Sequence, residues 1–166
     1  TIYRRTKLQP EALAEAAVAP GFSVRVLRMA RCFPEPPERM AMFRLHRGID
    51  ARDVASAHAA LLHDEGAAFA RYIACAPPPF LREDCRKLAT QPRGVLPRRA
   101  PLLLAEFERR GWPLPLSIDR VYDSALMRST LGWQARFGPD DVLQQYEAGS
   151  SEVLPRAQWI KDRVAE

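Results

Sequence analysis

The sequence predicts an α/β fold in which parallel strands are joined by helical crossovers and followed by a small, mostly helical portion. Two observations predict this class. Segments with helical periodicity alternate with short β-branched segments, and 47% of the 166 residues are hydrophobic, which is enough for one ordinary domain with a core. We expect residues 1–76 to hold two of the three strands together with the first helix, and residues 77–166 to form the mostly helical portion.

The expected elements alternate along the chain. They are a helix at 2–18, a strand at 22–30, a loop at 32–40, a helix at 50–65, a strand at 69–76, helices at 82–90 and 99–110, a strand at 117–124, a short helix at 124–133, and helical segments at 138–149 and 155–166. No glycine-rich phosphate loop follows any expected strand, so these residues alone cannot form a dinucleotide-binding turn.

The first helix and the first strand have clear local signals. Ala, Glu and Leu dominate residues 2–18, and Pro20–Gly21 would stop the helix. Pro10 is expected to kink or weaken it. The stretch "FSVRVLRMA" alternates through Val24 and Val26, which predicts a buried strand.

The next elements follow a proline-rich stretch, "CFPEPPERM", which predicts a loop. The helix after it places Val54, Ala57, Ala60 and Leu61 on one face, and Asp50 is its expected N-cap. "FARYIACA" then predicts the second strand.

The second half of the chain is mostly helical by the same criteria. "SIDRVYDS" predicts a strand, and Gly132 is expected to end the short helix in "SALMRSTLGW". Trp112, Trp133 and Trp159 are expected to be packing residues.

The basic balance of the chain does not indicate a nucleic-acid partner. The net charge is +5 and the pI is about 9.5, but the basic residues are scattered arginines, with Lys only at 7, 87 and 161 and no aromatic residues interleaved. No run approaches the roughly 20 apolar residues that cross a bilayer, so we expect a soluble protein with no membrane partner.

The three cysteines, Cys32, Cys75 and Cys85, are expected to be free thiols. Their odd number and the lack of C-x-x-C spacing argue against a disulfide framework or a zinc site and predict a reducing, cytoplasmic location. His58 and His63 are five residues apart, which does not put two imidazoles on one helical face, so no metal site is expected. The first residue is Thr rather than Met, so the sequence looks trimmed or excised at its start.

Tyr3 and Lys7 form the main candidate for catalysis. Four residues apart on a helix, their side chains lie about 6 Å apart on one side and can converge on one bound molecule. A nearby ammonium stabilises the phenolate and moves the pKa of a tyrosine from about 10 toward the working range. The tyrosine can then exchange a proton with a hydroxyl or carbonyl while hydride moves to or from a nicotinamide. Taken alone, the spacing favours the other interpretation, an exposed Tyr and Lys on a helix surface.

Four motifs favour the catalytic interpretation of Tyr3 and Lys7 over the surface one: "YRRTKLQPEAL", "VRVLRMARCF", "GIDARDVASAHAALL" and "LGW". In their order and spacing they resemble the C-terminal half of the extended short-chain dehydrogenase/reductase family, the NAD(P)-dependent sugar-nucleotide epimerases and dehydratases. The matched residues are Tyr3, Thr6, Lys7 and Glu11 for its Y-x-x-[ST]-K helix and following acid, Leu27 and Arg28 for its strand end, Asp53, Val54, Ala55 and Ala57 for V-x-D-V-A-x-A, and Leu131, Gly132 and Trp133 for LGW. The resemblance covers about residues 1–147 and implies part of a Rossmann-like domain at 1–76 and a substrate-binding portion at 77–166.

The resemblance implies roles at the cofactor. Tyr3 would be the general acid/base, and Lys7 would lower the pKa of that tyrosine and hold the nicotinamide ribose of NAD or NADP. The backbone at Met29 and the residue Cys32 would line the nicotinamide end of the cofactor site. For Cys32 a buried packing residue is the better interpretation from its residue type alone.

The resemblance also implies that Arg31 and Arg44 face a small-molecule substrate, either a sugar nucleotide or a related hydroxyl or carbonyl compound. A solvated arginine is an equally good interpretation of each. Arg28 is expected to pair with an acid near the end of the strand. The sequence departs from the family pattern where Arg31 replaces an Asn, where "CFPEPP" replaces a Y-G-P turn, and where the insert that grips the nucleotide is reduced to "ERMAMFRLHR".

Two functions therefore stay open. The first is the C-terminal portion of an NAD(P)-dependent epimerase/dehydratase-like oxidoreductase, inactive alone because the glycine-rich loop is missing. The second is a non-catalytic interaction or small-ligand-binding module descended from the same fold. In the family the tyrosine helix is commonly half of a dimer interface, so exposure of Leu13 with Ala17 would favour a homodimer through the helix of Tyr3 and Lys7.

Overall fold

A two-stranded parallel sheet with flanking helices leads into a second, mostly helical part. The computed structural model describes residues 2–154, apart from the side chains of Tyr3 and Arg4, so the helical segment expected at 155–166 lies outside the described residues. The elements are α1 (Ile2–Ala16), β1 (Val24–Met29), α2 (Pro37–His46), α3 (Ala51–Leu62), β2 (Phe69–Ala74), η1 (Arg82–Asp84), α4 (Cys85–Thr90), η2 (Pro92–Gly94), α5 (Leu96–Arg99), α6 (Pro101–Arg109), α7 (Ala125–Leu131) and α8 (Pro139–Glu147). None of these helices is long and apolar enough to cross a membrane.

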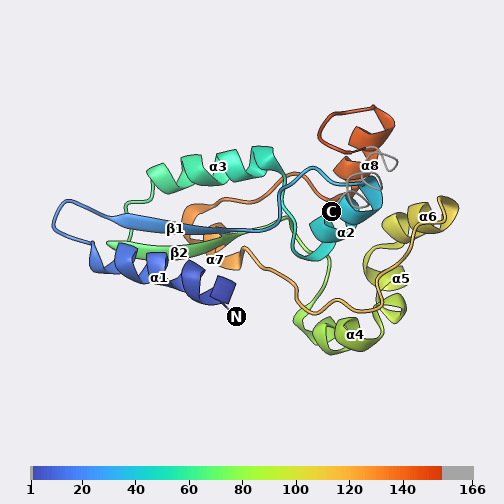
Figure 1. Ribbon diagram of the computed structural model, residues 1–166, viewed down its shortest axis with the longest axis horizontal. Coiled ribbons are helices and arrows are strands. Elements are labelled where there is room, and N and C mark those ends of the chain that lie inside the picture. The colour runs from blue at the N-terminus through green and yellow to red at the C-terminus, as the bar shows by residue number, and fades with distance from the viewer. Residues whose placement is uncertain (1, 155–166) are drawn as a thin grey trace.

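The sheet consists of β1 and β2 in parallel. Val24 lies opposite Phe69, and Met29 lies opposite Ala74. The chain between the strands includes α3, and Figure 1 shows α1 and α3 on opposite sides of the sheet. The α/β class with parallel strands joined through a helix is confirmed. Within residues 2–154 each strand pairs with one other strand, so each keeps an edge without a β partner.

The helix α3 begins and packs as its sequence predicts. The Asp50 carboxylate accepts a hydrogen bond from the backbone N–H of Arg52 at 2.9 Å, which confirms Asp50 as the N-cap. Ala57 and Leu61 are buried against the sheet, and Val54 is half-buried beside them. The apolar stripe therefore sets which face of α3 turns inward.

Two hydrophobic clusters hold the fold together, and they are not divided at residue 76. The cluster at the sheet takes Met127 and Trp133 from the second half of the chain. The cluster among the C-terminal helices takes Met40 and Leu45 from α2, which comes before β2 in the sequence. Each half of the chain therefore contributes to the core of the other.

Prolines place two helix boundaries differently from the sequence prediction. The segment 32–40 was expected to be a loop, but α2 begins at Pro37. The segment 99–110 was expected to be one helix, but α5 ends at Arg99 and α6 begins at Pro101. Proline suits the first position of a helix, because the N–H that it lacks has no partner inside the helix there. Pro10 lies inside α1, which continues to Ala16.

The strand expected at 117–124 is wrong, since the structure has no strand there. The backbone N–H of Ile118 donates to the carbonyl of Leu88 at 2.8 Å, and that of Tyr122 donates to the carbonyl of His46 at 2.8 Å. These acceptors belong to two different helices. The alternating pattern in this segment therefore buries side chains against separate partners and forms no ladder with a neighbouring strand.

Candidate functional site

Ion pairs, with little apolar burial, hold α1 against the sheet. The Arg28 guanidinium donates to both carboxylate oxygens of Glu11, at 2.9 and 2.6 Å, which confirms the expected pairing of Arg28 with an acid. Arg71 of β2 pairs with Glu15. The hydrogen bond from Arg28 holds the pKa of Glu11 below its ordinary value. Of the described α1 side chains only Glu11 and Ala14 are even partly buried.

These ion pairs fix how α1 runs along β1. Arg71 lies opposite Val26, and Arg28 follows two residues later in β1, whereas their partners in α1 are four residues apart. Four helical residues span about 6 Å, and two strand residues span about 6.6 Å. The two lengths match, so α1 runs antiparallel to β1: each turn toward the start of the helix moves about two residues toward the end of the strand. If the same step continued, Lys7 would fall near the carboxyl end of β1 and the backbone of Tyr3 beyond it.

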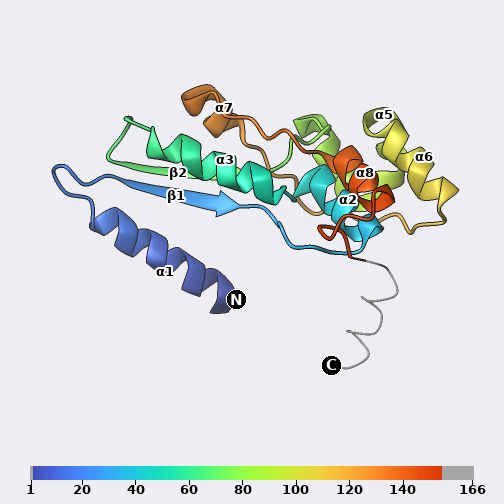
Figure 2. The ribbon, with the colours of Figure 1, turned by 90° about the horizontal axis from the view of Figure 1, so that it is seen from above.

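The first turn of α1 points toward the carboxyl end of β1, and Figure 2 shows the helix diverging from the strand as it approaches its N-terminus, which is level with the arrowhead but apart from it. Ligands of open parallel sheets bind outside this end of the strands. Lys7 is exposed there. The Tyr3 side chain lies outside the described residues, so its distance from the Lys7 ammonium stays a prediction.

The residues expected at the nicotinamide follow β1 directly. Met29 is 49% exposed and is available at the strand end. Cys32 is a half-buried free thiol that packs against the cluster at the sheet. The packing interpretation of Cys32 therefore has a contact to support it, whereas a contact with a cofactor stays a prediction.

Arg31 lies at the surface beyond the strand, but its guanidinium is engaged. It donates to both carboxylate oxygens of Glu35, at 2.7 and 2.8 Å, and this pair raises the pKa of Arg31. Its Cζ also lies 5.3 Å from the ring centre of Phe33 and 5.0 Å from that of Phe43. A substrate reaching Arg31 would have to share it with Glu35.

Arg44, which was expected to face substrate, lies in the interior. Its side chain is 3% exposed, and its Nη1 lies 3.0 Å from Oδ2 of Asp50. Burial raises the pKa of Asp50, but hydrogen bonds from Arg52 and the charge of Arg44 outweigh burial and hold that pKa well below its ordinary range. A buried charge needs a partner, so Arg44 compensates Asp50 at the start of α3 and offers no face to a ligand.

Asp53 of the third motif is a structural residue in this fold. It is 1% exposed, and its carboxylate oxygens accept the backbone N–H groups of Arg136 and Phe137 at 2.9 and 3.0 Å. Nearby, the Trp133 indole donates to the Ser56 hydroxyl at 3.0 Å. The third and fourth motifs therefore meet and tie the chain before α8 to the start of α3.

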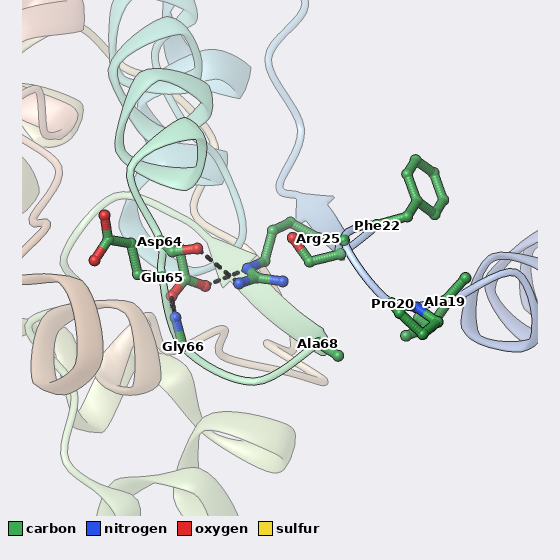
Figure 3. A pocket seen from close by; sticks show the side chains of 11 residues that line it. Ala19, Pro20, Phe22, Arg25, Asp64, Glu65, Gly66 and Ala68 are labelled. Carbon is green, nitrogen blue, oxygen red and sulfur yellow. Dashed lines mark hydrogen bonds and ion pairs between the residues drawn. The ribbon is translucent and has the colours of Figure 1, made fainter.

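A hollow lies at the opposite end of the strands from Tyr3 and Lys7, and Figure 3 shows its lining. It encloses about 610 Å³ around Arg25, whose Nε donates to Oδ2 of Asp64 at 2.5 Å. The Tyr72 hydroxyl donates to the same Asp64 oxygen at 2.9 Å. Burial raises the pKa of Asp64, but hydrogen bonds from Gly66, Tyr72 and Arg25 outweigh it and lower that pKa. Arg25, Tyr72 and Asp64 therefore satisfy one another's hydrogen bonds. Their contacts tie the loop after α3 to the sheet.

Sequence reasoning missed a group of arginines around Phe43. The Cζ atoms of Arg39 and Arg47 lie 5.6 and 4.9 Å from the centre of its ring, in addition to Arg31. A second hollow, of about 460 Å³, lies against the same ring. A signal was present, because residues 31, 35, 39, 43 and 47 are Arg, Glu, Arg, Phe and Arg at a constant spacing of four.

Metal chemistry has no candidate in residues 2–154, where no three His, Cys, Asp or Glu side chains gather into a ligand set. His58 contacts the backbone carbonyl of Val54 through Nδ1 at 2.9 Å. Cys75 is buried beside the Ser124 hydroxyl, 3.1 Å from its Sγ, and burial raises the pKa of its thiol. A thiol with a raised pKa is a poor nucleophile.

Comparison with known proteins finds no matching family model, no matching curated protein and no matching solved structure.

Proposed function

We propose that this chain is the catalytic-helix and C-terminal portion of an NAD(P)-dependent epimerase/dehydratase-like oxidoreductase that acts on a hydroxyl or carbonyl compound. The observation that carries the proposal is the direction of α1, whose pairs with Arg28 and Arg71 run it along β1 so that its first turn points toward the carboxyl end of that strand. Ligands of parallel sheets bind at that end, and residues four apart on a helix face the same molecule.

The chemistry follows from the two residue types. Bound NAD(P) would accept or supply hydride at its nicotinamide. Tyr3 would take a proton from a substrate hydroxyl or return it to a carbonyl, and the Lys7 ammonium would stabilise the phenolate between the two events. Lys7 would also donate hydrogen bonds to ribose hydroxyls.

The described residues suit only one end of such a cofactor. Met29 is 49% exposed at the end of β1, where the proposal puts the nicotinamide. The pyrophosphate end needs a glycine-rich turn at a helix N-terminus, and the sequence contains none. A second body of protein would supply that turn. The unpaired edge of β1 supports this part of the proposal, because parallel sheets are normally larger and covered on both faces.

Two measurements test the proposal. Titration of the 166-residue chain with NADH and NADPH, followed by nicotinamide fluorescence, should give no binding tighter than about 1 mM, and a micromolar Kd would contradict a missing phosphate site. Reading the open reading frame around these codons should reveal a strand followed by G-x-x-G-x-x-G upstream of Tyr3. Expression of that longer product with Tyr3→Phe should then remove turnover while NADH binding is retained.

The proposed partner of the chain is a second copy that packs through α1. Leu13 is 72% exposed, and Ala17 is exposed as well. Exposed apolar side chains on one face of a helix are typical of a face that packs against a partner. Ion pairs alone hold this helix weakly, because exposed pairs contribute about 0–1 kcal/mol each. Burial of Leu13 in a dimer would stabilise it further.

A non-catalytic ligand-binding module is the second candidate. The hollow beside Phe43 favours it, because that hollow is formed entirely within this chain and needs no cofactor. Absence of a glycine-rich loop from the complete reading frame would favour the module over the enzyme.

A further inference from the structure

The hollow beside Phe43 combines apolar walls with balanced charge. It encloses about 460 Å³ between α2 and the segment that follows Trp112. Its lining residues are Pro36, Glu38, Arg39, Met42, Phe43, Pro113, Leu114 and Pro115. One carboxylate and one guanidinium therefore accompany six apolar residues. An occupant with a net charge would find no surplus opposite charge in this lining, so the lining suits an uncharged, mostly apolar group.

The described part of the chain ends beside this hollow. The backbone N–H of Leu154 donates to the carbonyl of Glu35 at 3.0 Å, and Glu35 directly precedes the lining residue Pro36. Val153 is buried in the hydrophobic cluster against which Leu114 of the lining also packs. The segment that follows Leu154 in the sequence therefore starts close to the hollow.

That segment, residues 155–166, carries three large apolar side chains, Trp159, Ile160 and Val164. Twelve residues are too few to bury these side chains among themselves, so they need a surface on another part of the protein. The sequence predicts Trp159 to be a packing residue, and Trp159 lies outside the described residues. The residues that it packs against are the question that the hollow answers.

The hollow is within reach of Trp159. This residue comes five positions after Leu154, and a chain extends by at most about 3.3–3.6 Å per residue, so Trp159 can lie up to about 17 Å from Leu154. The hollow follows α2 from Pro36 to Phe43, and a helix advances only about 10 Å over those seven residues. The length of the segment therefore permits the contact.

Tryptophan has the chemistry that this lining accepts. Its ring is large and apolar, its indole N–H donates one hydrogen bond, and its face attracts a guanidinium. Arg39 supplies a guanidinium, and the Glu38 carboxylate can accept the indole N–H, because a carboxylate accepts several hydrogen bonds. Isoleucine and valine lack both the donor and the aromatic face. Among the apolar side chains of the segment, Trp159 therefore suits the hollow best.

We propose that Trp159 of the same chain occupies the hollow beside Phe43, and that residues 155–166 thereby dock on α2 and on the segment after Trp112. A small ligand could then enter the hollow only by displacing Trp159. The docking needs no cofactor, so it is independent of the proposed oxidoreductase activity. It also restricts the hollow as a ligand site in the second candidate function.

Nuclear Overhauser contacts in the isotope-labelled complete chain test the docking. We expect contacts from the ring protons of Trp159 to the methyl groups of Met42 and Leu114. Trp159→Ala should shift the amide signals of those two residues, whereas Gln158→Ala, at the adjacent polar position, should leave them unchanged. Contacts of the Trp159 ring only with other parts of the chain, or no contacts at all, would overturn the proposal.

A mixture of labelled and unlabelled chains distinguishes the chain's own segment from that of a second copy. Isotope-filtered spectra of an equal mixture should show no contact between Trp159 of one chain and Met42 of another. Such a contact would make the hollow an interface between two copies and would refute docking within one chain.

Free indole measures whether Trp159 fills the hollow. It is titrated into the wild-type chain and into the complete chain with Trp159→Ala, and the amide signal of Leu114 is followed. If Trp159 occupies the hollow about nine-tenths of the time, the variant should bind indole about tenfold more tightly than the wild type. Equal affinities of the two chains, or no binding of indole to the variant, would contradict the assignment.

Discussion

Replacing Asp53 tests the structural role that the fold gives to the third motif. Its buried carboxylate accepts two backbone N–H groups, from Arg136 and Phe137. Asp53→Asn keeps one acceptor oxygen but turns an amide NH₂ toward the second N–H, so two donors face each other. A buried donor left without an acceptor costs about 1–3 kcal/mol. Asp53→Ala removes both acceptors and should cost roughly twice as much.

Urea unfolding followed by circular dichroism measures these costs. We expect Asp53→Asn to lower the free energy of unfolding by about 2 kcal/mol, which for a chain of this size lowers Tm by about 4–8 °C. Asp53→Ala should lower it by about 4 kcal/mol, a large part of the 5–15 kcal/mol typical of a domain. Glu108→Gln, which also removes one carboxylate but at an exposed position, is the control and should change the free energy by less than about 0.5 kcal/mol. If Asp53→Asn is as stable as this control, the two hydrogen bonds do not hold the segment before α8.

Three further perturbations test separate parts of the structure. Burial lowers the pKa of His46 to about 4, so between pH 6.5 and 4 the unfolded chain binds a proton that the folded chain does not. The free energy of unfolding should therefore fall by about 3 kcal/mol across that window, with no contribution from His46 above pH 6.5, and His46→Asn should remove this slope in urea titrations. Gly48→Ala would place a Cβ within 2.7 Å of the α2 backbone and should cost about 2 kcal/mol or more in thermal unfolding, whereas Gly94→Ala, with open space around it, should be nearly neutral. Leu13→Glu should shift sedimentation from dimer to monomer, and Leu102→Glu, at an equally exposed leucine on α6, should not; a wild-type chain that stays monomeric would contradict the dimer.

Local signals predicted much of the helical structure. Asp50 caps α3 as expected, because an N-cap depends only on the residues that follow it within one turn. Gly132 ends α7 in the left-handed conformation with φ 64°, which glycine adopts without steric cost. Prolines, by contrast, led to wrong helix boundaries, because proline favours both a loop and the first turn of a helix. Pro37 and Pro101 begin helices for this reason.

The candidate site was predicted only in part. The spacing of Tyr3 and Lys7 puts them on one helix, and the level of that helix relative to β1 depends on Arg28 and Arg71. Arg44 shows the limit most clearly. Nothing within one turn of the sequence distinguishes an arginine that faces solvent from one buried against Asp50.

The sequence by itself determined α1, α3, β1 and β2, the N-cap of α3 and the glycine that ends α7, and it indicated that the two strands are parallel. These features depend on interactions within a few residues and on the crossover length. Only the tertiary structure decided that α2 packs with the C-terminal helices, that α7 returns to the sheet, and that three arginines gather around Phe43. Those contacts join residues far apart in the chain, so they depend on how the elements pack and on which charges burial forces to pair.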